Sequence, residues 1–198
     1  IKKIGEVILG FGILFMGLSI MSDSMSAVKN SPRILNFLAS LTNPFAAILV
    51  GFLITAVLQS SSATVGIILL MVSQKLLEFT ICPFMILGCN IGSCVSALVA
   101  SLSGKKDAKR AALIHFLFNV IGSAIFFCIL LVAVEPFTNA ILYISGGSLA
   151  RSVANVHTLM KVLEVAMMFP FMGWIVKLTY KIVPGKDTTA EDQYELLY

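Results

Sequence analysis

The feature that most constrains the fold of this chain is the run of residues 34–74, which contains no Asp, Glu, Lys, Arg or His. A membrane-spanning helix needs ~20 apolar residues, so a run of about twice that length is expected to lie in a lipid bilayer. Its middle carries five hydrogen-bonding side chains in six positions, Gln59-Ser60-Ser61-Ser62-Ala63-Thr64. Polar groups at that depth are costly in lipid and usually have a function. We therefore expect this polar element 59–64 to bind a polar species that crosses the membrane.

The composition extends the membrane assignment from this run to the whole chain. Hydrophobic residues make up 58% of the sequence and charged residues 12%, with a mean hydropathy of +0.97. A soluble domain has roughly 25% charged residues, and a soluble chain of 198 residues could not bury so much apolar surface. The positive charges lie between the apolar segments, as is typical near lipid headgroups. No basic tract alternates with aromatic residues, so we expect no nucleic-acid partner.

Charged residues divide the chain into six apolar segments, namely 7–21, 34–74, 79–104, 111–134, 136–149 and 153–183. This pattern predicts an all-α integral membrane protein, a multi-span helical bundle that occupies residues 1–184. We expect 111–134 to be the cleanest full-length span and 136–149 to be a separate, shorter segment. Residues 185–198 are polar and acidic, and are predicted to form a tail or a linker toward a soluble domain.

The polar element divides its run into two short arms. At ~1.5 Å of rise per residue, residues 44–58 and 63–74 are each too short to cross a bilayer alone. One continuous helix would also turn the polar side chains around its whole circumference, toward lipid. We therefore predict a re-entrant hairpin or a broken helix, with the polar element 59–64 at its tip and facing a protein cavity.

A second interruption is expected where Gly88 and Gly92 bracket Asn90 within a charge-free run. Two glycines in the middle of a membrane segment predict a helix break. Ser93 and Ser96 share a helix face. Their hydroxyl groups either extend the cavity or pack neighbouring helices through small residues.

The polar element offers neutral oxygens without any fixed charge. Such oxygens suit a hard cation such as Na⁺, whose hydration shell they can replace. The same hydroxyl groups can donate to an oxyanion, and a helix that begins just after the serines would add its N-terminal dipole and free N–H groups. The alternative is that the hydroxyl groups bond back to carbonyls of their own helices.

The remaining polar residues within the spans favour structural roles. His115 and Asn119 lie one turn apart, and we interpret them as a hydrogen-bonded pair between helices rather than as ligands. Lys161 and Glu164 stand at i and i+3, so they can neutralise each other as a structural or interfacial ion pair.

Catalysis finds little support in the sequence. It contains no G-x-S-x-G motif, no phosphate-binding G-x-x-x-x-G-K-[ST] loop, and no His or carboxylate pairs at metal-ligand spacing. The cysteines form no C-x-x-C pair and are expected to be buried, inert thiols; they are Cys82, Cys89, Cys94 and Cys128. We expect neither an enzyme nor a bound cofactor.

One short loop indicates the topology. Residues 105–110 contain four basic residues and one acidic residue between two apolar segments. The positive-inside rule therefore predicts that this loop lies on the cytoplasmic side of the membrane.

Four sequence elements together resemble the type II sodium/phosphate cotransporter family. Residues 55–64 resemble its Q-S-S-S signature, and residues 88–93 (G-C-N-I-G-S) resemble its G-A-N-I-G-T element. Residues 108–119 resemble a basic loop that runs into A-H-x-L-F-N, and residues 154–159 resemble a later A-N-x-H-T-L segment. The four occur in the family's order, and the resemblance extends to about residue 184.

The resemblance implies a sodium-coupled symporter of inorganic phosphate in the plasma (inner) membrane of a bacterium. Its members hold two inverted repeats, each with one Q-S-S-S element. This chain resembles the second repeat alone, so its partner would be another such repeat in the same chain or in a homodimer. Na⁺ would be the coupling ion, and no cofactor is implied.

The resemblance also implies a ligand set. These ligands are Gln59, Ser60, Ser61, Ser62 and Thr64, with Asn90 and Ser93 as supports and Na⁺ at the first four. Cys94 departs from the family pattern, where a second hydroxyl group follows Ser93, and Met160-Lys161 replaces the expected Phe-Asn. An ion channel or a transporter of another anion remains an alternative, as does a membrane interaction subunit that transports nothing.

Overall fold

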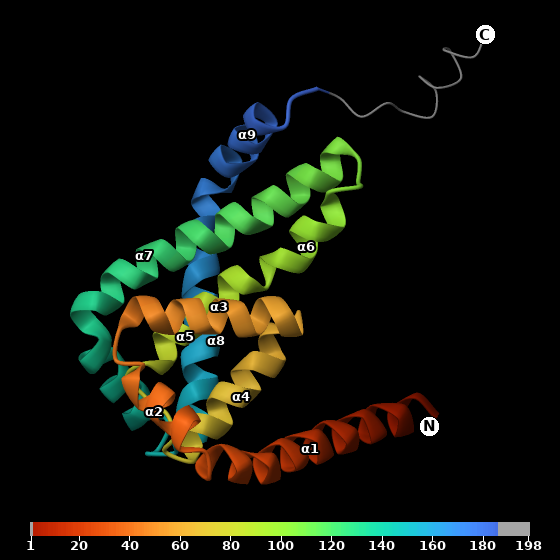
Figure 1. The fold of residues 1–198 in the computed structure, drawn as a ribbon. Coiled ribbons are helices and arrows are strands. Elements are labelled where there is room, and N and C mark those ends of the chain that lie inside the picture. Colours follow the sequence, from red (N-terminus) through yellow and green to blue (C-terminus); the bar gives the residue numbers. More distant parts are fainter. Residues whose placement is uncertain (1, 186–198) are drawn as a thin grey trace.

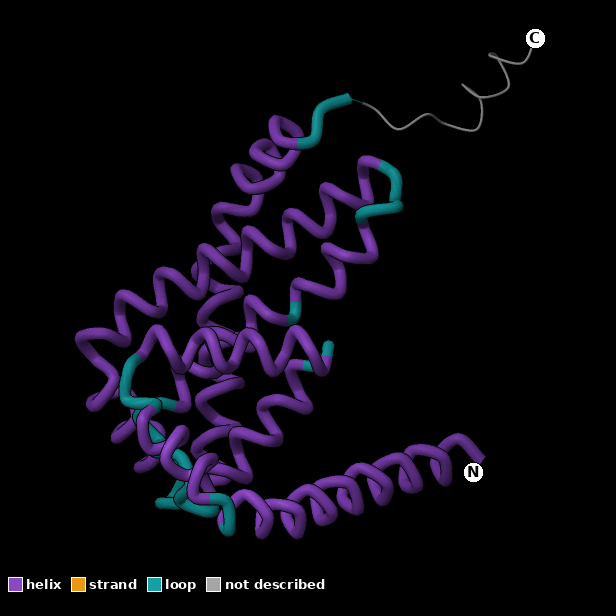
Figure 2. Tube along the Cα trace, viewed as in Figure 1, coloured by secondary structure: helices purple, strands orange, loops and turns teal. Residues whose placement is uncertain are grey.

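The computed structural model describes residues 2–185, and every element in this range is helical (Figures 1 and 2). The elements are α1 (Lys2–Lys29), α2 (Pro32–Ser40), α3 (Pro44–Leu58), α4 (Ser61–Ser73), α5 (Cys82–Gly92), α6 (Cys94–Ser101), α7 (Lys106–Ile144), α8 (Leu149–Met168), the 3₁₀ turn η1 (Phe169–Phe171) and α9 (Met172–Ile182). In this part of the chain, the stretches long and apolar enough to cross a membrane are Lys3–Ser24, Cys82–Ser101, Lys106–Ile144 and Leu149–Ile182.

This architecture confirms the predicted all-α integral membrane protein. The predicted polar tail, apart from its first residue, Gly185, lies outside the described residues. The assignment of residues 1–184 to one membrane repeat stays a prediction.

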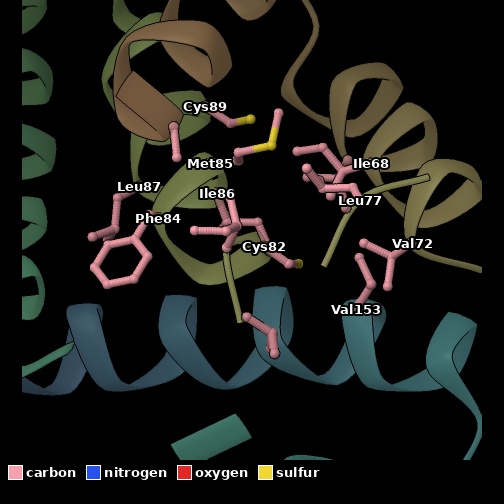
Figure 3. Packing of buried hydrophobic residues seen from close by; sticks show 14 of the residues in the cluster. Ile68, Val72, Leu77, Cys82, Phe84, Met85, Ile86, Leu87, Cys89 and Val153 are labelled. Atoms are coloured by element: carbon pink, nitrogen blue, oxygen red, sulfur yellow. The ribbon is translucent and has the colours of Figure 1, made fainter. Parts of the chain in front are cut away.

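Helix α5 forms the centre of the molecule. All of its residues except Ile91 are buried, and it packs against α3, α4, α7 and α8. Figure 3 shows Met85 and Ile86 of α5 among apolar side chains that include Ile68 of α4 and Val153 of α8. A helix that is apolar on all sides is stable only when neighbours cover every face, and α5 fulfils that condition.

Glycines at the crossing of α3 and α5 bring the two backbones into contact. A Cβ atom on Gly51 would overlap the carbonyl group of Met85, and a Cβ atom on Gly88 would overlap the carbonyl group of Ile48. A Cβ atom on Gly92 would lie 2.6 Å from the carbonyl oxygen of Phe52. Small residues of this kind permit close helix packing in lipid.

The helix break predicted at residues 88–93 is found at the end of that element, although Gly88 itself lies inside α5. Helix α5 continues through Gly88 and ends at Gly92, and α6 begins at Cys94. The interruption is confined to Ser93, whose φ of −63° and ψ of −20° stay in the right-handed helical region. The sequence does not tell the two glycines apart, because a glycine that permits close packing, such as Gly88, carries the same signal as a glycine at the end of a helix, such as Gly92.

The segments predicted at 111–134 and 136–149 are also joined, because α7 continues through both of them to Ile144. The helix bends at Ala133, where φ is −121° and ψ is 18°. Pro136 lies just beyond the bend; a proline inside a helix removes one hydrogen bond and clashes with the carbonyl group four residues earlier. The proline thus bends the helix instead of ending it.

Helix α1 projects from the other helices over most of its length (Figure 1). Its most apolar window, within Lys3–Ser24, has no buried residue. It contacts α2 and α4, and the Gln74 side chain donates a hydrogen bond of 3.3 Å to the Ser22 hydroxyl. Its apolar side chains, such as Phe11 and Phe15, are exposed, as expected for a helix surrounded by lipid or by another membrane segment.

Candidate substrate and ion site

The polar element 59–64 forms a joint between two short helices. Helix α3 ends at Leu58, Gln59 adopts the left-handed region with φ 52° and ψ 25°, and Ser60 is extended with φ −145° and ψ 104°. Helix α4 then starts at Ser61 in a new direction (Figure 1). Helices α3 and α4 have 15 and 13 residues, too few for either to cross a bilayer alone. The predicted broken helix is confirmed.

Gln59 holds a backbone conformation that L-residues rarely adopt. A non-glycine residue in the left-handed region costs about 1–3 kcal/mol and persists where the surrounding structure enforces it. Its N–H group donates to the carbonyl oxygen of Thr55 at 2.7 Å, which closes the last turn of α3. The change of chain direction at Gln59 leaves its side chain exposed. It also makes α4 a new helix, whose first N–H groups lack partners within that helix.

Two hydroxyl groups hold the joint together from inside. Thr55 and Thr64 are fully buried, and the Thr55 hydroxyl donates to Thr64 Oγ1 at 3.0 Å. Thr64 Oγ1 in turn donates to the carbonyl oxygen of Ser60 at 3.1 Å. Of the predicted ligands, Thr64 therefore lies behind the joint and connects α3 to α4.

Ser60 acts as the N-cap of α4. Its Oγ accepts a hydrogen bond from the N–H group of Ala63 at 3.3 Å and lies 3.3 Å from Ser62 Oγ. An N-cap serine satisfies one of the free N–H groups at a helix start. The alternative role of the hydroxyl groups, bonding back to a carbonyl group, therefore does not describe Ser60, whose Oγ accepts from an N–H group. It applies to Thr64, whose hydroxyl group donates to the carbonyl oxygen of Ser60.

The other predicted ligands in the joint have free polar groups. Within residues 2–185, the side chains of Gln59 and Ser61 make no hydrogen bond. Gln59 and Ser62 are exposed and Ser61 is half-buried. The joint thus presents a carboxamide and hydroxyl groups beside the N-terminus of α4.

The predicted supports, Asn90 and Ser93, lie in the layer behind the joint. Gly92 links them to it, since a Cβ atom on Gly92 would lie 2.9 Å from Thr55 Cβ. Ser93 Oγ donates to the carbonyl oxygen of Asn90 at 2.7 Å. The Asn90 side chain is directed elsewhere, with Nδ2 donating to Oε2 of Glu164 at 3.3 Å.

Glu164 belongs to a polar network whose extent the sequence does not reveal. Lys161 Nζ donates to Glu164 Oε2 at 3.2 Å and to Asn119 Oδ1 at 3.0 Å, so the predicted ion pair is confirmed. With Asn90, the pair forms a polar network of four side chains from α5, α7 and α8: Asn90, Asn119, Lys161 and Glu164. In the sequence the network appears only as separate polar residues within apolar segments, namely Asn90, Asn119 and the pair Lys161 and Glu164.

His115 and Asn119 both make contacts between helices, as expected, but with separate partners and not as one pair. Asn119 Nδ2 donates to the backbone carbonyl of His115 in the same helix at 2.9 Å, and its partner in another helix is Lys161. The ring of His115 lies at the surface, with Nε2 at 3.9 Å from Cys94 Sγ.

Cys82, Cys89 and Cys94 are buried free thiols, as expected, but Cys128 is exposed on α7. It fails the prediction because α7 turns that face away from the other helices. Among the described residues, no group of His, Cys, Asp and Glu is arranged to hold a metal ion.

The structure places most of the basic segment 105–110 in the first turns of α7. Arg110, the last residue of this segment, binds the backbone that follows α9. Its guanidinium group donates to the carbonyl oxygens of Val183, at 2.8 and 3.1 Å, and of Gly185. It also pairs with Asp107 at 2.6 Å and lies 4.1 Å from the centre of the Tyr180 ring. The end of α9 and the basic loop are therefore on the same side of the molecule (Figure 1).

Comparison with known proteins identifies relatives over most of the chain. The model of a family described as Na+/Pi-cotransporter matches residues 20–172, a range that contains both the joint and the polar network. The chain is 28% identical over 189 residues to the uncharacterized protein YqeW of Bacillus subtilis (strain 168), covering 94% of this chain and 59% of YqeW.

Two further relatives have names that mention phosphate. The chain is 30% identical over 190 residues to the sodium-dependent phosphate transport protein 2A of Rattus norvegicus, covering 89% of this chain and 28% of that protein. YjbB of Salmonella typhimurium, whose name describes inorganic phosphate export, is 23% identical over 198 residues, with 97% of this chain and 35% of YjbB covered. The chain thus spans between about a quarter and three fifths of these relatives, and no solved structure matches it.

Proposed function

The chain belongs to the Na⁺/Pi-cotransporter family, as its motif order predicts, and from this premise we propose that it supplies one half of a sodium-coupled symporter of inorganic phosphate. The observation that carries this proposal is the joint between α3 and α4, where free polar side chains lie beside the start of a helix. We assign Na⁺ to the oxygens of Gln59, Ser60, Ser61 and Ser62. Phosphate binds at the same hydroxyl groups and at the N–H groups of α4.

The chemistry of the joint suits both ions. Neutral carbonyl and hydroxyl oxygens replace the hydration shell of a hard cation. A helix N-terminus carries a partial positive charge of roughly +0.5 and free N–H groups, and both favour an oxyanion. Na⁺ bound at the joint lowers the electrostatic cost of bringing a phosphate dianion into the membrane, and this dependence couples the two ions.

The joint is half of the complete site. Gln59 and Ser62 are exposed at its outer side, and the remaining ligands come from a second Q-S-S-S repeat in the same chain or in a homodimer. The site then opens to each side of the membrane in turn, as in transporters that carry broken helices at the centre of inverted repeats.

We place the protein in the inner membrane of a bacterium, with loop 105–110 in the cytoplasm. The excess of basic residues in this short loop supports that orientation. Because the Arg110 contact holds the end of α9 beside the loop, residue 185 lies on the cytoplasmic side as well.

Transport of radiolabelled phosphate into proteoliposomes tests the proposal. An inward Na⁺ gradient is expected to drive phosphate accumulation, and an equal choline gradient is not. Replacing Gln59→Ala and Ser61→Ala together removes free ligand groups while leaving the Thr55–Thr64 hydrogen bond in place. The double variant is therefore expected to reduce Na⁺-dependent uptake by at least about tenfold, the effect of losing ~1.4 kcal/mol of binding free energy.

Ser73→Ala is a matched control, because Ser73 is an exposed serine of the same helix that bonds only to the carbonyl oxygen of Leu69. It should transport as the wild type does. Uptake that ignores Na⁺, or that survives the double substitution, would contradict the proposal. Stronger competition by another anion than by phosphate would instead favour a different substrate, and uncoupled flux would favour a channel.

A further inference from the structure

Glu164 is a buried carboxylate within a segment apolar enough to cross a membrane. The side chain is 1% exposed, and it lies inside the candidate span Leu149–Ile182. An ionisable group at such a depth is expensive and normally marks a functional site. Its two carboxylate oxygens differ in the number of hydrogen bonds that they accept.

Both donors of the polar network reach the same carboxylate oxygen. Asn90 Nδ2 and Lys161 Nζ each donate to Glu164 Oε2, at 3.3 and 3.2 Å. Within the part of the chain that the structure describes, Glu164 Oε1 is buried without a hydrogen-bond partner. The same is true of the neighbouring amide oxygen, Asn90 Oδ1. Buried acceptors without a donor are rare, because each one loses its hydration without compensation.

A different orientation of the Asn90 amide would not remove the imbalance. Exchanging its oxygen and nitrogen would place Oδ1 opposite Glu164 Oε2, so that two acceptors would face each other. The two free oxygens therefore call for an additional group that carries a positive charge or donates hydrogen bonds.

Lys161 already supplies one positive charge to the network from its edge, although it bonds neither of the two free oxygens. Its side chain is 36% exposed while that of Glu164 is 1% exposed, so the ammonium group reaches inward on a flexible stem. It lies between Asn119 Oδ1 and Glu164 Oε2. An ammonium group bound only by oxygens occupies the kind of position that a small cation would take.

We propose that Glu164, Asn90 and Asn119 form a second cation site, separate from the joint, in which Lys161 is a tethered competitor of Na⁺. When Na⁺ binds the carboxylate and the two amide oxygens, the ammonium group is displaced toward the exposed edge. The carboxylate stays neutralised in both states, which limits the cost of the exchange in the membrane. The choice of Na⁺ as the ion rests on the proposed function; the oxygen site itself rests on the polar network.

Carboxylate and amide oxygens are ligands that hard cations prefer. The Glu164 carboxylate cannot move further toward α7, because it already lies against Gly122. A Cβ atom on Gly122 would lie 2.5 Å from Glu164 Oε1. The carboxylate is thus packed against the backbone of α7, which fixes the direction of its free oxygen.

The thermal stability of the purified protein, measured against NaCl with choline chloride at constant ionic strength, tests the proposal. All variants carry Gln59→Ala and Ser61→Ala, so that the joint does not contribute. Lys161→Met removes the competitor, and the apparent Na⁺ affinity is expected to rise on the order of tenfold, within the usual range of coupling between two ligands. Adding Glu164→Gln should abolish the Na⁺ response.

Two further variants serve as controls. Lys177→Met removes an exposed lysine of α9 and should leave the Na⁺ response unchanged. Asn90→Leu keeps the Lys161–Glu164 pair but removes one proposed ligand, so it should weaken the response even if Lys161→Met fails to fold.

A Na⁺ response that is the same with and without Lys161, that survives Glu164→Gln, or that Asn90→Leu leaves unchanged would overturn the proposal. The polar network would then be a structural ion pair whose free oxygens bind water. The result is independent of transport: loss of Na⁺-dependent phosphate uptake in the Gln59→Ala, Ser61→Ala variant tests the joint, and the Lys161→Met response tests the second site.

Discussion

At the scale of single residues, the buried contact between Thr55 and Thr64 determines how the joint is held. Replacing Thr55→Val keeps the shape of the side chain but removes the hydroxyl group that donates to Thr64 Oγ1. We expect a loss of about 1 kcal/mol in stability, since hydrogen bonds between membrane helices contribute about 0.6 kcal/mol on average and up to about 1.7 kcal/mol.

The thermal unfolding midpoint of the protein in detergent measures this effect. Thr55→Ser retains the hydroxyl group and should restore the hydrogen bond, although it loses a methyl group. If Thr55→Val were as stable as the wild type, the contact would not hold α3 to α4.

The joint residues could be predicted from the sequence and the polar network could not, because the joint is local in the sequence and the network is not. Gln59 and its serines stand out because they are consecutive in an uncharged run. Glu164 depends instead on Asn90, which is 74 positions away, and on the packing of α5, α7 and α8. Separation in the sequence carries no information about such contacts, so a Lys-x-x-Glu pair reads as an ordinary ion pair.

At the scale of helices, the close crossing of α3 and α5 predicts that folding depends strongly on the glycines at the crossing. A Cβ atom on Gly88 would overlap the backbone of Ile48, and a backbone contact cannot relax as a side chain does. Gly88→Val should therefore separate the two helices and prevent folding, a loss larger than the roughly 3 kcal/mol of ordinary overpacking.

The yield of monodisperse protein in size-exclusion chromatography measures this outcome. Gly17→Val is the matched control, because a Cβ atom at Gly17 of α1 meets nothing within 4 Å. Equal yields of the two variants would show that the backbones at the crossing can move apart at little cost.

Helix boundaries could be predicted where polarity changes and not where packing decides. Asn43-Pro44 gives the start of α3, and the polar element gives the end of α3 and the start of α4. Both signals come from the local chemistry of the sequence. The continuation of α5 through Gly88 and the bend of α7 at Ala133 depend on neighbouring helices. Gly92 and Pro136 are compatible with a break, a bend or a close contact, and only the packed structure selects one of them.

At the scale of the whole molecule, Arg110 connects the basic loop to the end of α9. Replacing Arg110→Gln removes hydrogen bonds to two backbone carbonyls, Val183 and Gly185. Hydrogen bonds to charged groups are worth about 1.5–3 kcal/mol, so we expect hydrogen exchange in the last turns of α9 to accelerate by about tenfold or more.

Hydrogen–deuterium exchange followed by mass spectrometry measures this change. Lys109→Gln alters the charge of the same loop by the same amount at an exposed position and should leave α9 protected. Equal acceleration in both variants would indicate a general effect of charge rather than the Arg110 contact.

The three glycine contacts between α3 and α5 also have a mechanical consequence. Because the backbones touch at Gly51, Gly88 and Gly92, the two helices can rotate only as a single lever. Asn90 lies on this lever, whereas Glu164 lies on α8. In the proposed transport cycle, a swing of the joint would therefore shift Asn90 against Glu164, and one rigid body would time the opening of both proposed ion sites.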